Sequence, residues 1–288
     1  MTFRELNISP AMSLIVDLDA EAAPKPRILV VSLEYQECYD ESVNRFLTPM
    51  TELASVQRVK KAATLTRLLS NEDSEPYSAL VLTDAALTLP ENLPLWEHVL
   101  SYLRRTGATA VLTGQVACVV IPDDLDEFFR VSGLPDWKAG MYQRNIVVMN
   151  EQADGIRDAT HFDIGNKNGL KAAYSVKSLC LSGVKSEHSW YVPDATQEDP
   201  NLNAAAILAR GLQGRDPERV RQQAAVAYGP VGEKGRVSWV GDMNTEDPSV
   251  KVILALCGLD PAKAHVEPLK PHGMRSDATQ GRFVETEH

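Results

Sequence analysis

The sequence predicts an α/β protein in which a mostly parallel sheet is covered by helices on both faces. Over the first 132 residues, short apolar runs alternate with segments of helical period, and four such strand–helix units can be counted. The run at 27–33 is apolar at nearly every position, which is typical of a strand buried on both faces. Two further apolar segments near the end of the chain are separated by a glycine-containing turn, which predicts a C-terminal β-hairpin.

The predicted elements of this first part follow one another closely. Residues 1–26 are acidic and end in Ala-Ala-Pro-Lys-Pro, so we expect an N-terminal arm. In the segment 93–105, Trp96, Val99 and Leu103 recur at helical spacing, and Gly107 is placed to end the helix. Strands are expected at 27–33, 55–59, 78–84 and 108–114, and helices at 40–53, 64–70 and 93–105.

After residue 132 the regular pattern is interrupted. Strands are predicted at 141–149 and 177–184, and an irregular segment rich in Gly, Asn and Asp begins at 150. These segments suit an antiparallel extension of the sheet or an inserted lobe, and we expect the insertion over about 150–205. The hairpin is predicted at 223–232 and 235–242, and a last helix begins at Pro248 and ends before Gly258. The expected organisation is one α/β domain over 27–260 and a tail over 261–288.

Composition narrows the class of protein. With 288 residues, 44% of them hydrophobic, the chain can bury a full core. Its net charge of -10 disfavours binding to nucleic acid or to anionic membranes. No apolar run approaches the ~18 residues of a membrane span, so we expect a cytoplasmic protein. The four cysteines form no C-x-x-C pair and lie in or beside apolar runs, which predicts reduced, buried thiols.

Three segments carry a resemblance to a known family. They are AVAYGPVGEKGRVSWVGDMNTED (225–247), FFRVSGLPDWKAG (128–140) and YSVKSL (174–179). With the order of the elements, they resemble the class I glutamine amidotransferase-like superfamily, in particular its ThuA-like branch. The segments are also similar to uncharacterised filamentous-fungal proteins, some labelled triacylglycerol lipases. The resemblance covers roughly residues 27–260 and implies a flavodoxin-like three-layer sandwich.

The chain departs from the catalytic pattern of that superfamily. The nucleophilic Cys of active members would fall at the turn after the fourth strand, where this chain has Gln115, and an amide nitrogen is no nucleophile. The family's His would follow the last core strand, where this chain reads Gly-Asp-Met-Asn (241–244). Cys118, three residues beyond Gln115, is expected to be a packed thiol rather than a displaced nucleophile. G-x-S-x-G is also absent, so we expect neither a glutamine amidotransferase nor a Ser lipase.

Candidate site residues follow from the rule that ligands of open α/β sheets bind beyond the carboxyl ends of the strands. We expect Glu34, Gln115 and Asp242 to be catalytic. Glu34 resembles the functional Glu that PfpI-type relatives have after their first strand. Carboxylates crowded in a partly dry site would have at least one raised pKa, which suits acid–base chemistry. Substrate contacts are expected from Tyr35, Asp84 and Asn244. The alternative is structural: Asp and Asn are favoured at turns and helix starts, and Gln115 could satisfy local backbone groups.

A second candidate segment is Ser-Glu-His-Ser-Trp-Tyr (186–191). His188 and Trp190 are expected to contact substrate from a lid edge, although a packed or solvated His is the alternative. His161 and Asp163 form an H-x-D without a third ligand, so no metal is expected. No phosphate-binding or dinucleotide motif is present, and we expect no cofactor.

Two functions stay open on this reasoning. The first is a cofactor-independent enzyme that acts on a small organic substrate by isomerisation, cyclisation, hydration or elimination. The fungal resemblance suggests secondary metabolism as its setting. The second is a ligand-binding or scaffold pseudoenzyme that kept the fold without the chemistry. A homodimer is compatible with both.

Overall fold

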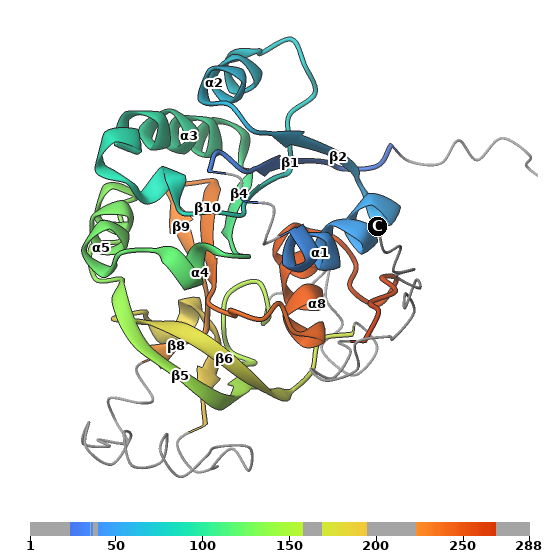
Figure 1. The fold of residues 1–288 in the computed structure, drawn as a ribbon, viewed down its shortest axis with the longest axis vertical. Coiled ribbons are helices and arrows are strands. Elements are labelled where there is room, and N and C mark those ends of the chain that lie inside the picture. Colours follow the sequence, from blue (N-terminus) through green and yellow to red (C-terminus); the bar gives the residue numbers. More distant parts are fainter. Residues whose placement is uncertain (1–23, 35, 37–39, 158–168, 195–222, 269–288) are drawn as a thin grey trace, which may run out of the picture.

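The structure, a computed structural model, describes residues 24–34, 36, 40–157, 169–194 and 223–268. Its centre is one ten-stranded sheet with the order β2-β1-β3-β4-β10-β9-β7-β5-β6-β8 (Figure 1). In the described part of the chain, no helix has the length and apolar character needed to cross a membrane.

One half of the sheet is parallel, as the sequence predicts. Four neighbouring pairs, from β2 through to β10, run in the same direction. The register aligns Val31, Leu82, Leu112 and Trp239 across the sheet, so these strands end at one common edge. The strands are β1 (Arg27–Val31), β2 (Ser55–Val59), β3 (Ala79–Leu82), β4 (Thr109–Leu112) and β10 (Gly235–Val240).

Helices cover both faces of the parallel half, which confirms the three-layer arrangement there (Figure 1). On one face, α2, α3 and α5 contribute buried side chains such as Trp96 and Phe128 to the first core. On the other face, α1 and α8 contribute Phe46 and Ile253 to the second core. The helices are α1 (Asp40–Leu53), α2 (Ala62–Ser70), α3 (Leu93–Thr106), α4 (Val116–Val119), α5 (Pro122–Val131) and α8 (Asp247–Leu256), with short 3₁₀ turns η2 (Ala86–Thr88), η3 (Pro90–Asn92) and η4 (Ser186–His188).

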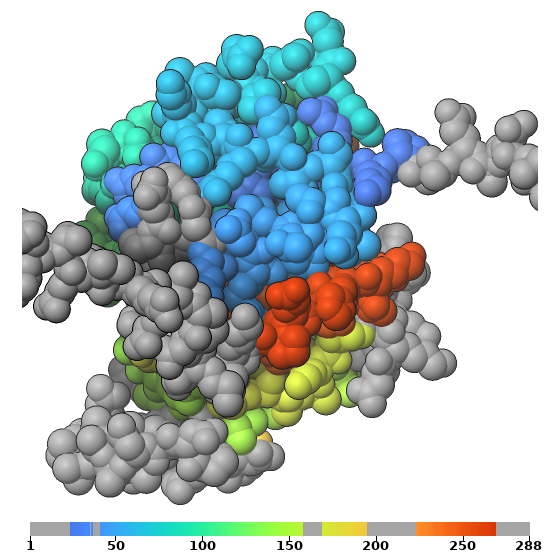
Figure 2. Space-filling model, turned by 45° about the vertical axis from the view of Figure 1, so that its right-hand side comes forward, coloured from blue at the N-terminus to red at the C-terminus, as the bar shows by residue number. Residues whose placement is uncertain are grey.

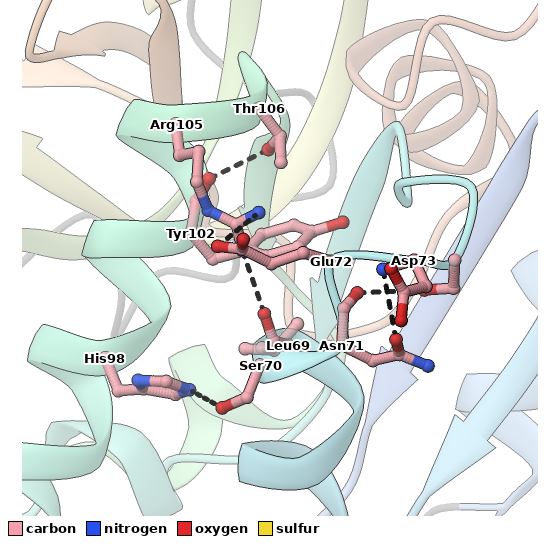
Figure 3. A network of polar contacts seen from close by, with 10 residues as sticks. Leu69, Ser70, Asn71, Glu72, Asp73, His98, Tyr102, Arg105 and Thr106 are labelled. Carbon is pink, nitrogen blue, oxygen red and sulfur yellow. Dashed lines mark hydrogen bonds and ion pairs between the residues drawn. The ribbon is translucent and has the colours of Figure 1, made fainter.

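Helices α2 and α3 are joined by a polar network at their C-terminal ends (Figure 3). Arg105 donates to the carbonyl of Leu69 at 3.0 Å and pairs with Glu72 at 3.5 Å. Its guanidinium also lies 5.5 Å from the ring centre of Tyr102. A cation at this position satisfies a carbonyl that the end of α2 leaves without an intrahelical partner.

The prediction of a mostly parallel sheet is wrong, because the other half of the sheet is antiparallel. Five neighbouring pairs, from β10 through to β8, are antiparallel. The burial in β6 fits this arrangement, since buried and half-buried residues alternate there, a pattern typical of a strand with one covered face. The predicted C-terminal hairpin is confirmed as β9 and β10. These strands are β5 (Lys138–Met149), β6 (Ala173–Ser182), β7 (Ser189–Pro193), β8 (Gln223–Ala224) and β9 (Val226–Val231).

The antiparallel half closes on itself. The chain just beyond β10 hydrogen-bonds to β6: Leu179 donates its N–H to the carbonyl of Gly241, and Met243 donates to Lys177, each at 3.0 Å. Ser178 and Asp242 form the bridge between them. The segments β10, β9, β7, β5 and β6 therefore form a closed ring, and this ring brings β6 beside the end of the parallel strands.

The chain after α8 continues to pack against the second core. Leu259 and Ala264 are buried there. The Lys251 ammonium donates to the carbonyl of Pro261 at 2.9 Å, and Arg45 of α1 donates to that of Glu267 at 3.4 Å. Figure 2 shows this orange-red segment lying against the blue N-terminal elements.

Candidate functional site

The predicted residues that follow the parallel strands are brought to one edge of the sheet. Glu34, Asp84, Gln115 and Asp242 lie just after β1, β3, β4 and β10, in that order across the sheet. Neighbouring strands are about 4.8 Å apart, so the backbones at Glu34 and Gln115 are separated by two intervals, about 10 Å. We call these four residues the strand-end row.

Close backbone contacts hold the row together. Thr83 accepts the backbone N–H of Gln115 at 3.2 Å, and the hydroxyls of Thr83 and Ser32 are 2.7 Å apart. Gly114 has a φ of +68°, and a Cβ there would lie 3.2 Å from the Thr83 carbonyl. The left-handed turn and the short approach both favour glycine, and together they direct the chain into α4 directly after Gln115.

Asp84 is engaged by backbone groups. The residue is 6% exposed, and its two carboxylate oxygens accept the N–H groups of Glu34 and Ala86, each at 3.1 Å. Burial raises the pKa of this carboxyl, and the two backbone hydrogen bonds oppose the rise. Asp84 thus connects the loops after β1 and β3, which is the structural alternative considered for it.

Asp242 has the same kind of environment. It is 3% exposed, and its oxygens accept the N–H groups of Asn244 at 2.8 Å and Glu246 at 2.7 Å. Burial raises its pKa, and hydrogen bonds from Ser249 and from these two N–H groups counteract the effect. The Asn244 amide donates to Glu246 at 3.2 Å. Asp242 and Asn244 therefore organise the turn that leads into α8.

Gln115 and Glu34 differ from the two aspartates. Gln115 is 5% exposed and precedes α4, yet its side chain makes no capping hydrogen bond. Within the described residues, neither the Gln115 amide nor the Glu34 carboxylate has a hydrogen-bond partner. Glu34 is exposed, and its backbone N–H is held by Asp84. The row thus contains two side chains that stabilise the fold and two that make no hydrogen bond to the part of the chain that the structure describes.

Cys118 lies one helical turn beyond Gln115 and is partly exposed, unlike the buried Cys180 and Cys257. Its Sγ donates to the carbonyl of Met243 at 3.7 Å. Burial and the nearby Asp242 raise the pKa of the thiol, while Lys177 lowers it. The thiol is therefore protonated at neutral pH and is not an activated nucleophile.

His188 and Trp190 are not brought to the strand-end row. The His188 ring lies 6.4 Å from that of Trp137, and burial lowers its pKa. Trp190 is 1% exposed, and its Nε1 donates to the carbonyl of Asp154 at 2.8 Å. The pairing explains this position: Ser189 is opposite Ala227, and Ala227 is opposite Trp239.

The chain therefore carries His188 back alongside β10, whereas the row lies beyond the end of that strand. Tyr35, His161 and Asp163 are outside the described residues. Within the described ones, no group of three or more His, Cys, Asp or Glu side chains is placed to hold a metal ion.

Three charged residues beside the row escaped prediction from the sequence. Arg144 of β5 pairs with Glu246 at 3.1 Å, and the Lys177 ammonium of β6 lies 5.3 Å from the ring centre of Tyr142. Arg144 and Lys177 reach this place only because the antiparallel ring closes between β6 and the chain after β10. The alternating pattern of β6 indicates which side chains share a face, but no local signal places that face next to Asp242.

No family model matches the chain, and no curated protein sequence matches it. Among solved structures, it is similar to a ThuA-like protein from Parabacteroides merdae, with 12% identity and a TM-score of 0.45 over 86% of this chain and 94% of that one.

A ThuA-like protein from Bacteroides uniformis is similar over 61% of this chain and 70% of that one, with 12% identity and a TM-score of 0.39. A GMP synthase subunit from Thermoplasma acidophilum is similar over 81% and 93%, with 12% identity and a TM-score of 0.40. At such identities and TM-scores, these similarities assign neither a family nor a function. Membership of the amidotransferase-like superfamily stays a prediction.

Proposed function

We propose that the protein is a cofactor-independent enzyme that binds a small organic molecule over the carboxyl ends of its parallel strands. The observation that carries the proposal is the Gln115 side chain, which lies at the common edge of the strands, is 5% exposed and makes no hydrogen bond to a described residue. Its amide atoms are not among the fully buried polar atoms that lack a partner, so a ligand at this edge can reach them. A bound ligand would supply the missing partner, and Gln115 offers it two N–H donors and one carbonyl acceptor.

Glu34 is the acid–base group of this proposal. Its carboxylate is exposed and has no hydrogen bond to the described residues, whereas the carboxylates of Asp84 and Asp242 are each held by two backbone N–H groups. A free carboxylate about two strand intervals from Gln115 can exchange a proton with a substrate that the amide orients. Isomerisation, cyclisation, hydration and elimination all need such a transfer.

The family part of the proposal rests on the resemblance of the sequence segments. We place the chain in the glutamine amidotransferase-like superfamily, near its ThuA-like branch, as a member in which an amide has replaced the nucleophile. A fungal origin and a role in secondary metabolism have the same basis. The protonated Cys118 thiol is consistent with chemistry other than amide transfer.

A second candidate function is ligand binding without turnover. The observation that favours it is the engagement of Asp84 and Asp242 by backbone groups, which leaves Glu34 as the one carboxylate of the row that is available for proton transfer. A binding protein needs Gln115 and does not need Glu34.

The test is a screen of small carboxylic acids, amides and hydroxy compounds, read by thermal melting for binding and by mass spectrometry for conversion. Gln115→Ala should abolish the rise in melting temperature, and Glu34→Gln should slow conversion by about 10²–10⁴-fold. Gln152→Ala and Glu52→Gln, at exposed positions away from the row, are the matched controls. Binding without conversion in the wild type would favour the second candidate, and unchanged binding by Gln115→Ala would overturn both.

A further inference from the structure

Two cations face each other across the pair of strands next to the row. Arg144 of β5 is directly opposite Lys177 of β6 in the antiparallel register, so their side chains lie on the same face of the sheet. Like charges in this arrangement destabilise a strand pair unless an anion lies nearby. The pair is conspicuous in a protein whose net charge is -10.

Only one of the two cations is neutralised within the described part of the chain. Arg144 pairs with the Glu246 carboxylate at 3.1 Å and donates to the Ser175 hydroxyl at 3.4 Å. Half-buried Lys177 has no acidic partner among the described residues, and its ammonium contacts the face of the Tyr142 ring. The Lys177 charge is therefore available to an anion.

Lys177 stands at the end of the strand-end row. Its carbonyl accepts the N–H of Met243 at 3.0 Å, and the Met243 carbonyl accepts the Cys118 thiol. The Cys118 N–H in turn bonds to the carbonyl of Gln115 at 2.9 Å. Across the sheet, Gln115 lies two strand intervals from β6 and two from β1, about 10 Å in each direction.

We propose that Lys177 and Gln115 together bind the carboxylate of an anionic organic substrate, the remainder of which extends along the row toward Glu34. This inference rests on the proposed function of Gln115. An ammonium and an amide supply five N–H donors and one acceptor, which suits the acceptor-only oxygens of an ionised carboxylate. The exposed Tyr142 ring, beside the ammonium, forms the outer wall for an apolar part of the ligand.

The experiment is an NMR titration of the protein with acetate, succinate and benzoate, and with acetamide, succinamide and benzamide as neutral counterparts. The side-chain amide signals of Gln115, assigned by their loss in Gln115→Ala, report binding at the row. The variants are Lys177→Met, which removes the charge, and Lys177→Arg, which keeps it. Lys185→Met makes the same charge change at an exposed position away from the row. A thermal melt verifies that each variant is folded, and the rise in melting temperature with ligand reads binding in Gln115→Ala, which lacks the amide signals.

The expected result is that the carboxylates bind more tightly than the corresponding amides. Lys177→Met should weaken the affinity for the carboxylates by about 10-fold or more, as the loss of a charge-assisted hydrogen bond predicts. Lys177→Arg and Lys185→Met should bind as the wild type does. The bound carboxylate should also slow alkylation of Cys118, read by mass spectrometry of its peptide, because it neutralises the cation that lowers the pKa of this thiol.

Three outcomes would overturn the inference. Unchanged carboxylate binding by Lys177→Met, with binding lost in Gln115→Ala, refutes the role of Lys177 and leaves the proposed function in place. Carboxylate binding that depends on Lys177 but not on Gln115 refutes the joint site. If the wild type saturates with none of the carboxylates, the anionic substrate class is wrong. Changes in the NMR signals of the Gln115 side-chain amide on addition of the neutral amides would still support the proposed function.

Discussion

Replacement of Asp242 separates a structural role from a catalytic one. Both carboxylate oxygens accept backbone N–H groups, from Asn244 at 2.8 Å and from Glu246 at 2.7 Å, in a site that is 3% exposed. Burial of the charged carboxylate outweighs the hydrogen bonds that it accepts, because the net result is a raised pKa. Removal of the side chain, however, leaves two backbone N–H groups without a partner, at a cost of about 1–3 kcal/mol each. We expect Asp242→Ala to lower the free energy of unfolding by about 2–4 kcal/mol.

The pH dependence gives a second, independent measurement on the same residue. Because the folded-state pKa of Asp242 is raised, its contribution to stability is fully present below the unfolded value of about 3.9 and is lost as the pH rises through the folded value. Asn cannot ionise. The stability advantage of the wild type over Asp242→Asn should therefore be largest near pH 4 and smaller at pH 7.

The assay for both is urea unfolding followed by tryptophan fluorescence, with Asp136→Ala as a control at an exposed aspartate. The control should stay within about 0.5 kcal/mol of the wild type. If Asp242→Ala is as stable as the control, the reasoning from the two backbone hydrogen bonds is wrong. If that stable variant has also lost function, Asp242 is the catalytic group that the sequence predicts.

Three further predictions test other parts of the molecule. Cys118→Ala should leave binding or turnover within a few-fold of the wild type, and a loss of about 100-fold, or about 2.7 kcal/mol, in a folded variant would identify the thiol as a nucleophile. Gly241→Ala should destabilise the closed ring by about 3 kcal/mol or more, since its Cβ would lie 2.0 Å from the Leu179 carbonyl oxygen. Gly258→Ala is its control, because a Cβ at Gly258 meets no atom within 4 Å and costs only the strain of a positive φ, about 1–2 kcal/mol. Equal urea midpoints for the two glycine variants would contradict the steric argument. Arg105→Met should lower the free energy of unfolding by about 1 kcal/mol through the lost bond to Leu69, and a melt unchanged from the wild type would show that this network does not stabilise the α2–α3 contact (Figure 3).

The regular elements of the parallel half were predictable from the sequence. The helix expected at 40–53 is α1, and the strand expected at 55–59 is β2. Gly107 ends α3 in the left-handed conformation with a φ of +80°. These features depend on residues within one or two turns of each other, so the local pattern contains the information that decides them. The direction of the later strands depends on distant pairing, so the sequence left an antiparallel extension and an inserted lobe both open, and the expectation of a mostly parallel sheet failed.

By itself, the sequence determined that Glu34, Asp84, Gln115 and Asp242 follow strands of one parallel sheet, because buried strands and the residues after them are visible in the chain. Only the tertiary structure decided which of these side chains are already held by backbone N–H groups. It also decided that Lys177 joins the row, since its place depends on the bridge between Ser178 and Asp242. A hydrogen bond between segments far apart in the chain leaves no local pattern. For that physical reason, the amide and the cation that pair with no acidic or capping group among the described residues could be recognised only in the folded protein.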